Sequence, residues 1–423
     1  MRDYDLSLWR QTNCERLDAR PLSGDVTVDL AVIGGGYTGC SAALRAAQAG
    51  ASVCLLEAHQ IGHGGSGRNV GLVNAGLWLP PDEIRGHLGQ EAGNRLIELL
   101  TNAPTEVFDL IGTHGIACEP VRNGTLHCAH SASGYQDLQT RHAQLSGAGA
   151  PVELLDAETA RLRTGSAAVH GALFDPRAGT IQPLAYVVGL ARAAQEAGAR
   201  IHTQSPVQSL QQEAAGWVIQ GKTGTVRARS VIQATNAYHQ GIADTAPDYV
   251  PVYYFQYATA PLSHNLRASI LPQGEGCWDT GLIMTSFRLD QAGRFIIGGM
   301  GELSSAGGFA HKAWVKRKLA ALYPQLTGQP LSEGWQGRIA MTADHIPKIT
   351  QIGPNALSVH GFSGRGIGPG TVFGRLMAES LLNEDPSVLP VLPVSEYSEN
   401  WTGLRRAFFE SGAALTHFIK ARF

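Results

Sequence analysis

Residues 29–57, DLAVIGGGYTGCSAALRAAQAGASVCLLE, constrain the fold more than any other stretch of this 423-residue chain. An apolar, β-branched run at residues 28–33 predicts a buried parallel strand. Small residues follow with Leu44 on one face, as in a helix that packs closely against a sheet. Gly50 ends that helix, and residues 52–56 predict a second strand. This order indicates a βαβ unit, and therefore a parallel sheet with helices on its faces.

The turn between the first strand and the helix has the spacing GxGxxG. Gly34 permits the tight turn, Gly36 lets the backbone approach a pyrophosphate, and Gly39 lets the helix pack close to the strand. Glu57 ends the second strand, about 20 residues beyond the glycines, where a carboxylate accepts hydrogen bonds from ribose hydroxyls. Together these features predict a dinucleotide-binding cradle. Its contacts are expected at Gly34, Gly36, Tyr37, Thr38, Gly39, Glu57 and Ala58.

The bulk composition narrows the class of protein. A formal net charge of −2 gives no electrostatic footprint for a nucleic acid. The six cysteines contain no CxxC and no zinc-ligand spacing, so we expect free thiols and no metal site. The N-terminus has charges where a signal peptide needs an apolar stretch, and no run approaches membrane-spanning length. A cytoplasmic protein is therefore expected.

The sequence pattern changes several times along the chain, which predicts two interleaved domains. One is an α/β, doubly wound, Rossmann-like domain, and the other is inserted into it and built on a largely antiparallel sheet, with α+β character overall. The nucleotide-binding domain is expected at residues 26–80, 180–240 and 335–385. The substrate domain is expected at residues 81–179 and 241–334, followed by a C-terminal helical tail at 386–423.

Three further stretches extend the cradle. Residues 62–71 form a glycine-rich loop directly after the βαβ unit. Residues 230–238, SVIQATNAY, read as a strand whose small terminal residue lets the backbone pass close to a bound dinucleotide. Residues 361–371, GFSGRGIGPGT, lead into a helix, so that unpaired N–H groups and the positive helix end would face a ligand.

The motifs DLAVIGGGYTGCSAAL, GGSGRNVG, SVIQATNAY and GFSGRGIGPGTVFG, in this order, resemble the FAD-dependent amine and amino-acid oxidase family, which is D-amino-acid-oxidase-like. The leading Ser7-Leu8-Trp9 and the loop Ser66-Gly67-Arg68-Asn69 resemble most its γ-glutamylputrescine oxidase and L-pipecolate oxidase branch. The resemblance extends from Ser7 to about Leu382. It implies FAD as cofactor, bound without a covalent link, because some relatives attach flavin through a C-terminal cysteine and no cysteine follows Cys277 here.

The resemblance also implies a set of FAD contacts outside the first motif. Val207 would present its backbone to the adenine, and the helix after residue 370 would stabilise negative charge on the reduced flavin. Ser66 and Arg68 resemble phosphate and flavin contacts. The implied positions are Gly65, Ser66, Arg68, Asn69, Val207, Ala234, Thr235, Gly364, Arg365, Gly366 and Ile367.

The implied reaction is oxidation of a C–N bond. A neutral amine lies over the flavin with its α-C–H near N5, a hydride transfers, and the imine leaves. The electrons pass to oxygen or to a respiratory, quinone-linked acceptor. Because flavin chemistry performs the difficult step, no catalytic side chain is assigned. The preferred substrate is L-pipecolate, an intermediate of lysine catabolism, and the alternatives are γ-glutamylputrescine and other secondary amino acids such as sarcosine, or glycine.

Five residues are candidates for the substrate side. Tyr253 and Tyr254 lie on an aromatic strand that would roof the flavin. Arg288 and Lys348 are candidate carboxylate anchors, and Arg68, named above as a cofactor contact, is the alternative anchor. Arg288 is preferred because a guanidinium binds a carboxylate in a bidentate fork. His345 is a candidate either for a pocket-lining residue or for a loop histidine with its own hydrogen-bond partners, and no role as base is assigned to it.

Two other classes of protein share these features. One is the FAD domain of a tRNA-modifying enzyme, which the near-neutral charge and the lack of an appended methyltransferase disfavour. The other is a membrane-associated respiratory dehydrogenase, since residues 404–423 have the pattern of an interfacial amphipathic helix as well as of a tail that docks on its own domain. The residues of that pattern are Phe408, Leu415, Phe418 and Ile419 among Arg405, Arg406, Lys420 and Arg422.

Overall fold

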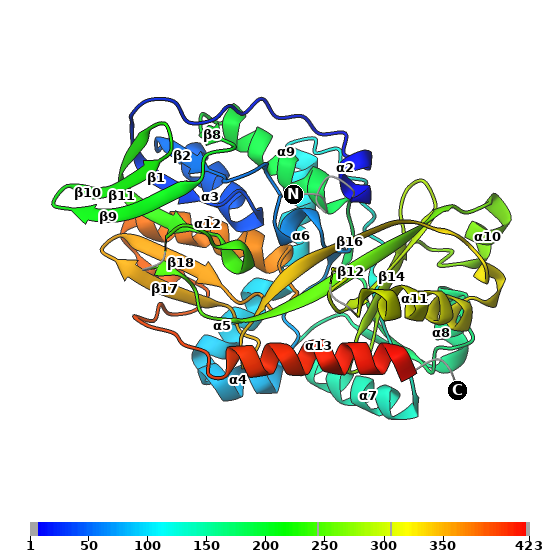
Figure 1. Ribbon diagram of the computed structural model, residues 1–423. Helices are drawn as coiled ribbons and strands as arrows, with labels where there is room; N and C mark the ends of the chain where they lie inside the picture. The colour runs from blue at the N-terminus through cyan, green and yellow to red at the C-terminus, as the bar shows by residue number, and fades with distance from the viewer. Residues whose placement is uncertain (1–6, 243–244, 305–306, 420–423) are drawn as a thin grey trace.

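Two eight-stranded sheets organise the computed structural model, which describes residues 7–242, 245–304 and 307–419. The first sheet lies on the left of Figure 1 and the second on the right, and two long strands of the second sheet, β12 (Val250–Pro261) and β16 (Leu331–Met341), reach toward the first. The path of the first sheet is β17-β18-β11-β1-β2-β8. These strands are β1 Val26–Ile33, β2 Val53–Leu56, β8 Arg200–His202, β11 Thr225–Gln233, β17 Lys348–Gly353 and β18 Ala356–His360.

The centre of the first sheet is parallel, as predicted for a doubly wound domain. β1 pairs in parallel with β2 and with β11, β2 pairs in parallel with β8, and β11 with β18. Residues 225–233 form one continuous strand, β11. The reason is that β1 pairs with both halves, while the antiparallel hairpin of β9 (Val207–Glu213) and β10 (Gly216–Gly221) borders only the first half.

Helices cover the first sheet and bury its apolar strands. The alanine-rich helix α3 (Tyr37–Gln48) packs between α9 (Pro183–Glu196) and α12 (Gly368–Asn383). Residues 90–113 form two helices, α5 (Gln90–Thr101) and α6 (Ala103–Thr113), because a proline stands in the first turn of α6. Both helices contact α12, and they contribute to the hydrophobic core beneath β1, although this stretch was predicted to belong to the substrate domain.

The second sheet follows the order β16-β12-β15-β14-β13-β4-β6-β5 and is antiparallel except between β13 and β4. This is the largely antiparallel sheet that the sequence predicted for the second domain. The bounds are β4 Thr125–Cys128, β5 Glu153–Leu155, β6 Ala172–Asp175, β12 Val250–Pro261, β13 Gly276–Asp279, β14 Thr285–Leu289, β15 Arg294–Met300 and β16 Leu331–Met341.

One predicted domain limit falls inside β16. The third piece of the nucleotide domain was expected to begin at residue 335, yet β16 pairs with β12 along its length. Gly334 and Gly337 made the sequence of this segment resemble the glycine-rich stretches of the first domain. In the structure they permit close packing instead, because a Cβ at Gly334 would lie 2.5 Å from the Tyr257 ring and one at Gly337 would lie 3.2 Å from the Arg68 Cβ.

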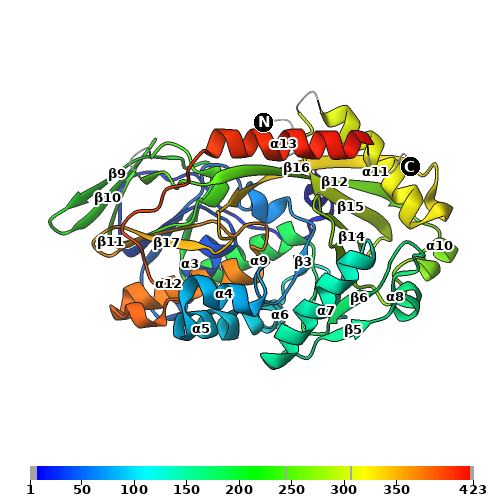
Figure 2. The ribbon, with the colours of Figure 1, turned by 90° about the horizontal axis from the view of Figure 1, so that it is seen from below.

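The C-terminal helix α13 (Thr402–Ile419) crosses the outside of the molecule against β12 and α11 (Gly308–Leu322), as Figures 1 and 2 show. This agrees with the predicted helical tail, although Lys420 and Arg422 lie outside the described residues. At the contact with α11, the Nδ1 atoms of the buried His311 and His417 lie 2.8 Å apart. No helix within the described residues is both long and apolar enough to cross a bilayer.

The His311–His417 contact predicts that acid weakens the docking of α13. Burial lowers the pKa of His311 to about 4 and that of His417 to about 3. Because both values lie below the unfolded value of about 6.5, the unfolded chain binds more protons and stability falls as pH falls from about 6.5 toward 4. We expect the melting temperature of the wild type to drop between pH 7 and pH 5 more than that of His417→Asn. Equal drops in the two proteins would contradict this prediction.

Candidate active site

One large cavity lies where the carboxyl ends of β1, β11 and β18 meet one face of the second sheet. Its volume is about 1320 Å³, above the roughly 300–1,000 Å³ typical of a pocket for one drug-sized ligand. Of the cofactor residues predicted from the sequence, all except Gly39 line it. They are Gly34, Gly36, Tyr37, Thr38, Glu57, Ala58, Gly65, Ser66, Arg68, Asn69, Val207, Ala234, Thr235, Gly364, Arg365, Gly366 and Ile367.

The glycines of the first turn leave room that a side chain would fill. Gly34 has a φ of +108°, and a Cβ there would lie 2.7 Å from the Ala234 carbonyl oxygen of the neighbouring strand. A Cβ at Gly39 would lie 1.9 Å from the Gly34 carbonyl oxygen, so this glycine sets the close approach of α3 to β1. Gly36 is the N-cap of α3, has no side-chain cap and lines the cavity. This arrangement fits a pyrophosphate at the positive end of the helix.

Glu57 joins the cradle from the end of β2. Its Oε2 accepts a hydrogen bond from the Gly35 N–H at 2.7 Å, and its Oε1 accepts one from the His59 N–H at 2.8 Å. Burial raises the pKa of Glu57, and the two N–H groups oppose that rise. Since an ionised carboxylate has about four acceptor sites, each oxygen retains one for a ribose hydroxyl.

The Glu57→Gln variant is expected to bind FAD about ten-fold more weakly than the wild type. The glutamine amide keeps one acceptor oxygen but turns an NH₂ group toward a backbone donor, which costs about 1–2 kcal/mol. Titration of the apoprotein with FAD, followed by flavin fluorescence, measures the change. An unchanged dissociation constant would remove Glu57 from the cofactor site.

The loop at residues 62–71 is held by its own side chains. Ser66 Oγ accepts from the Tyr37 N–H at 3.1 Å, which places the loop over the start of α3. Asn69 Nδ2 donates to the Gly65 and Ser66 carbonyls, and the Asn69 carbonyl accepts from Trp9 Nε1 at 2.8 Å. Asn69 therefore fixes the loop backbone as well as lining the cavity.

Arg68 ties this loop to the second sheet. Its Nε donates to the His63 carbonyl at 2.9 Å, and its Nη1 donates to the Gln336 carbonyl at 3.0 Å. The Arg68 carbonyl in turn accepts from Trp335 Nε1 at 2.9 Å. These bonds hold the wall of the cavity where β16 passes over the loop.

The second sheet forms the other wall. Val252, Tyr254 and Gln256 project from one face of β12 into the cavity, in the two-residue period of a strand. The Tyr254 hydroxyl donates to Ser286 Oγ at 3.1 Å, and burial raises its pKa. Tyr253 points to the opposite face, where the Arg406 guanidinium lies 5.4 Å from its ring centre, so its prediction as a substrate contact is wrong.

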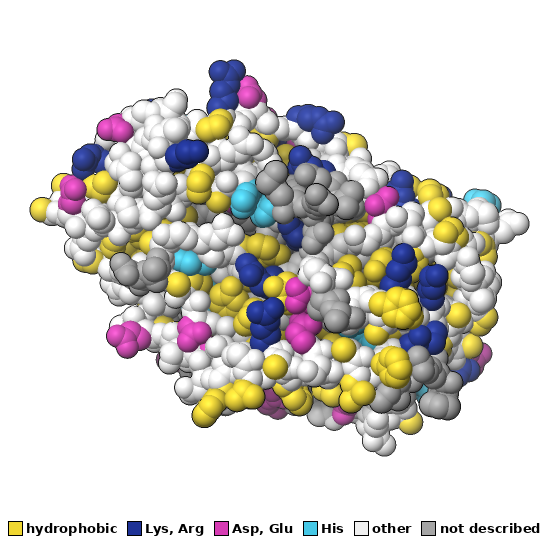
Figure 3. All heavy atoms as spheres, viewed as in Figure 1, with side chains coloured by type: hydrophobic (Ala, Val, Ile, Leu, Met, Phe, Trp, Pro, Cys, Tyr) yellow, Lys and Arg dark blue, Asp and Glu magenta, His cyan; other side chains and the backbone are white. Residues whose placement is uncertain are grey.

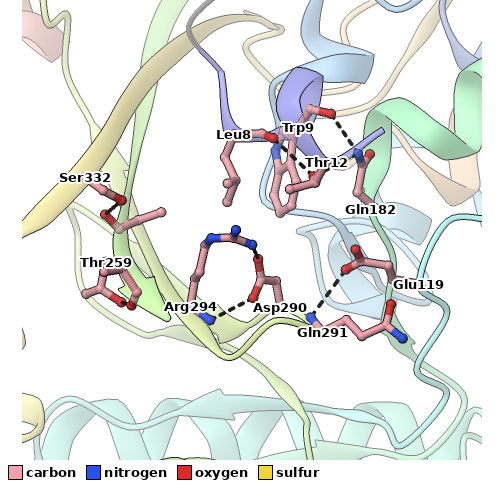
Figure 4. Close-up of polar contacts among 12 residues, drawn as sticks. Leu8, Trp9, Thr12, Glu119, Gln182, Thr259, Asp290, Gln291, Arg294 and Ser332 are labelled. Atoms are coloured by element: carbon pink, nitrogen blue, oxygen red, sulfur yellow. Dashed lines mark hydrogen bonds and ion pairs between the residues drawn. The ribbon is translucent and has the colours of Figure 1, made fainter. Parts of the chain in front are cut away.

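Arg288 does not reach the cavity. It follows the cavity-lining Ser286 on the same face of β14, but the strand has by then passed the cavity edge and the guanidinium lies 5.1 Å from the Trp9 ring. Figure 4 shows that the neighbouring carboxylates have other partners, because Asp290 pairs with Arg294 at 3.0 Å and Glu119 accepts from the Gln291 N–H. Burial lowers the pKa of Arg288 to about 10. We therefore withdraw Arg288 as the substrate anchor.

The other two candidates from the sequence differ in position. Lys348 lies on β17, outside the cavity, where it forms an ion pair with Asp344, so it is also withdrawn as an anchor. His345 lines the cavity with a φ of +53°, and burial lowers its pKa. A neutral His345 on the wall agrees with the first of its two alternatives, a pocket-lining residue.

Arg365 is the cation that the structure directs toward the substrate region. Its guanidinium lies 4.8 Å from the Trp78 ring centre and 5.0 Å from the Trp278 ring centre, so it is held between two indoles. Its Nη1 donates to the Ala75 carbonyl at 3.0 Å, and its buried Nε has no partner within the described residues. Burial, assisted by the charge of Arg141, lowers the pKa of Arg365 to about 9. A bound anion would give the Nε–H an acceptor and would raise the pKa of Arg365 again.

Sequence reasoning missed the residues around Arg365. Trp278 stacks on His127 with ring centres 4.9 Å apart, and burial holds the pKa of His127 well below its usual range. Arg141, from α7 (Ala132–Gly147), lines the same cavity. None of these residues belongs to a local motif, since α7, β4 and β13 meet only in the folded chain. The sequence signal that could have pointed to this region is Arg365 itself, an arginine in place of a small residue in the glycine-rich stretch 361–371.

This cradle and this substrate wall match a known family. Residues 29–380 match the family described as FAD dependent oxidoreductase. The chain belongs to this family. It is an FAD-dependent oxidoreductase of the amine and amino-acid oxidase type, and its glycine-rich turn, its 62–71 loop and its 361–368 segment line one cavity.

Curated relatives of this FAD-dependent oxidoreductase match along most of their length. A probable oxidoreductase OrdL of Rhizobium meliloti is 31% identical over 366 residues, 86% of this chain and 85% of that protein. The γ-glutamylputrescine oxidoreductase of Escherichia coli is 30% identical over 363 residues, 85% of each chain.

Solved structures agree with the fold. Glycine oxidase of Geobacillus kaustophilus superposes with a TM-score of 0.71 at 19% identity, covering 88% of this chain and all of the other. An L-amino acid deaminase of Proteus vulgaris superposes with a TM-score of 0.74 at 17% identity, covering 90% and 97%. These neighbours confirm the predicted combination of a Rossmann-like domain and a substrate domain.

FAD is expected to be released intact by acid or heat. Five of the six cysteines are buried and the sixth is exposed, and none of the six lines the cavity within the described residues. A thiol therefore cannot reach the cofactor. Acid precipitation should leave yellow colour in the supernatant, and flavin fluorescence that stays with the denatured chain on a gel would contradict the expectation.

Proposed function

We propose that this flavoenzyme oxidises the C–N bond of an amine that also carries a carboxylate. γ-Glutamylputrescine is placed first, because the Escherichia coli relative at 30% identity is named for that compound and because of the charges in the cavity described below. L-Pipecolate, the substrate predicted first from the sequence, has the same two groups and is the second candidate. Glycine and sarcosine complete the set to be tested.

The observation that carries this proposal is the position of Arg365. It lies in the same cavity as the cofactor cradle, and no carboxylate of the described residues forms an ion pair with it. A buried guanidinium without a counter-ion is costly, and a substrate carboxylate would supply two charge-assisted hydrogen bonds. The two indoles fix its plane, so a bound carboxylate would be oriented as well as attracted.

The wall of the cavity formed by α7 favours the longer substrate. There Asp137 and Arg141 bring one charge of each sign to the cavity. The head of γ-glutamylputrescine carries one α-carboxylate, which Arg365 would hold with Arg141 beside it, and one α-ammonium, which would face Asp137. L-Pipecolate has no charged groups other than its ring amine and its carboxylate, so Asp137 would have no partner in it.

The chain's own contribution is positioning and charge. FAD, when bound, supplies the acceptor for the hydride that leaves the carbon next to the amine. Arg365 holds the carboxylate, while Val252 and Tyr254 provide a wall that limits how the substrate can lie. His127 is neutral because its pKa is lowered, so it adds no second cation beside Trp278 that would compete for the carboxylate.

Anaerobic bleaching of the bound flavin tests the proposal directly. The panel contains γ-glutamylputrescine, L-pipecolate, sarcosine and glycine, with γ-aminobutyrylputrescine and piperidine as the matched amines of the first two that lack only the carboxylate. Bleaching by carboxylated amines and much slower bleaching by their matched amines is the expected result. Equal rates within each pair would contradict it. Reoxidation by air against a soluble quinone then assigns the electron acceptor as oxygen or a quinone-linked carrier.

A further inference from the structure

Helix α13 turns an apolar stripe toward solvent. Leu404, Phe408 and Leu415 fall on one face of the helix and are 65%, 73% and 60% exposed. Trp401, directly before the helix, is 75% exposed. A surface helix normally buries its apolar face, and a contiguous exposed one marks an interaction site. The stripe lies beyond residue 380, where the family match ends, so it is not explained by the flavin site.

The opposite face of α13 is the one that docks on the protein. Ala413 and His417 are buried there, and His417 stacks on Trp314 of α11 with ring centres 4.0 Å apart. Arg317 of α11 donates from Nη2 to the His417 carbonyl. The helix is therefore fixed by its small and polar side, and its aromatic and aliphatic side is presented outward.

The neighbouring helix α11 adds cations to this surface. Phe309 is 86% exposed, and Lys312 and Lys316 are exposed one and two turns further along the same helix. The exposed charged side chains on the described parts of α11 and α13 are all basic, the third being Arg406, which pairs with Glu302 at 3.6 Å. Figure 3 shows Lys and Arg side chains beside apolar ones over this part of the molecule.

We propose that the exposed faces of α13 and α11 dock on an anionic lipid bilayer. Aromatic and leucine side chains flanked by lysines are the composition of helices that lie in a membrane interface. Figures 1 and 2 show that α13 lies lengthwise along the outside of the molecule, with α11 beside it. A symmetric contact with a second copy would bring these cations together without exposed acids on either helix to pair with them.

Co-sedimentation of the flavin-loaded protein with lipid vesicles tests this surface. We expect binding to vesicles of phosphatidylcholine with phosphatidylglycerol and little binding to phosphatidylcholine alone. Phe408→Ser and Leu415→Ser should each weaken binding about ten-fold or more, by loss of buried apolar area. Lys312→Gln and Lys316→Gln should each weaken it about five-fold, and added salt should weaken it further.

The matched control is Leu162→Ser, because Leu162 is a leucine on α8 (Ala157–Thr164) that is 73% exposed and away from this surface. It should bind vesicles like the wild type, and all variants should keep the flavin absorbance and the anaerobic bleaching rate. The proposal would be overturned if the wild type did not bind anionic vesicles. It would also be overturned if Leu162→Ser and Phe408→Ser weakened binding to the same extent. A change of mass from dimer to monomer in Phe408→Ser, by light scattering, would assign the surface to a second copy instead.

Discussion

Replacing Gly36 with valine is expected to yield a folded protein that purifies without flavin. The backbone at Gly36 is extended, with φ −90° and ψ −172°, so valine fits the chain conformation. Its Cβ would lie 3.0 Å from Ser66 Oγ, a contact that a small shift of the serine relieves. The rest of the side chain then occupies the cavity wall at the start of α3, where the backbone meets the pyrophosphate.

The ratio of flavin absorbance, at about 450 nm, to protein absorbance, at about 280 nm, measures flavin content. Circular dichroism measures folding. Gly36→Ala is the matched control, since a single methyl group extends less far into the cavity and should retain part of the flavin. Gly39→Val is expected to fail at folding instead, because its Cβ would lie 1.9 Å from a backbone oxygen. Full flavin occupancy in Gly36→Val would show that the cofactor does not lie on this turn.

Replacing Arg365 with glutamine is expected to raise KM for carboxylated amines about 100-fold and to leave the flavin spectrum intact. A charge-assisted, bidentate contact in a partly buried site is worth roughly 3 kcal/mol, which corresponds to that factor. Arg365→Lys keeps the charge but loses the fork and the stacking between Trp78 and Trp278, so it should recover only part of the affinity.

Steady-state kinetics with a carboxylated amine and with its matched amine separate binding from general damage. The melting temperature of the holoenzyme controls for the lost bond from Arg365 to the Ala75 carbonyl. If Arg365→Gln purifies without flavin, the residue belongs to the cofactor site, as the family resemblance implied. If it keeps flavin and KM is unchanged, the carboxylate lies elsewhere, and Arg338, whose buried Nε has no partner within the described residues, becomes the next candidate.

The cofactor half of the fold was predictable because its signals are local. The turn Gly34–Gly39, the strand before it and Glu57 lie within one βαβ unit, and each residue type has a reason that depends only on its neighbours in sequence. Even the close approach of α3 to β1 follows from the absence of a side chain at Gly39. The same holds for the long antiparallel strand β12, whose alternating aromatic pattern indicated a strand.

The substrate side was not predictable in the same way, because it depends on where strands cross the cavity. Arg288 has the right chemistry and lies on the right face of β14, but one pleat too far along the strand. The prediction for Lys348 failed for a similar reason. Its ion-pair partner Asp344 lies in the loop before β17, and the lysine lies outside the cavity. Trp78 and Trp278, which hold Arg365, are far apart in sequence, and no period or motif relates them.

The most direct test of this account combines the Arg365→Gln variant with the paired substrates under anaerobic conditions. For the wild type, the rate of flavin bleaching at low substrate should be about 100-fold higher with γ-glutamylputrescine than with γ-aminobutyrylputrescine, or with L-pipecolate than with piperidine, in whichever pair is active. In Arg365→Gln this ratio should fall close to one, since the carboxylate has lost its partner. A ratio that stays at its wild-type value in the flavin-loaded variant would show that Arg365 does not bind the substrate carboxylate.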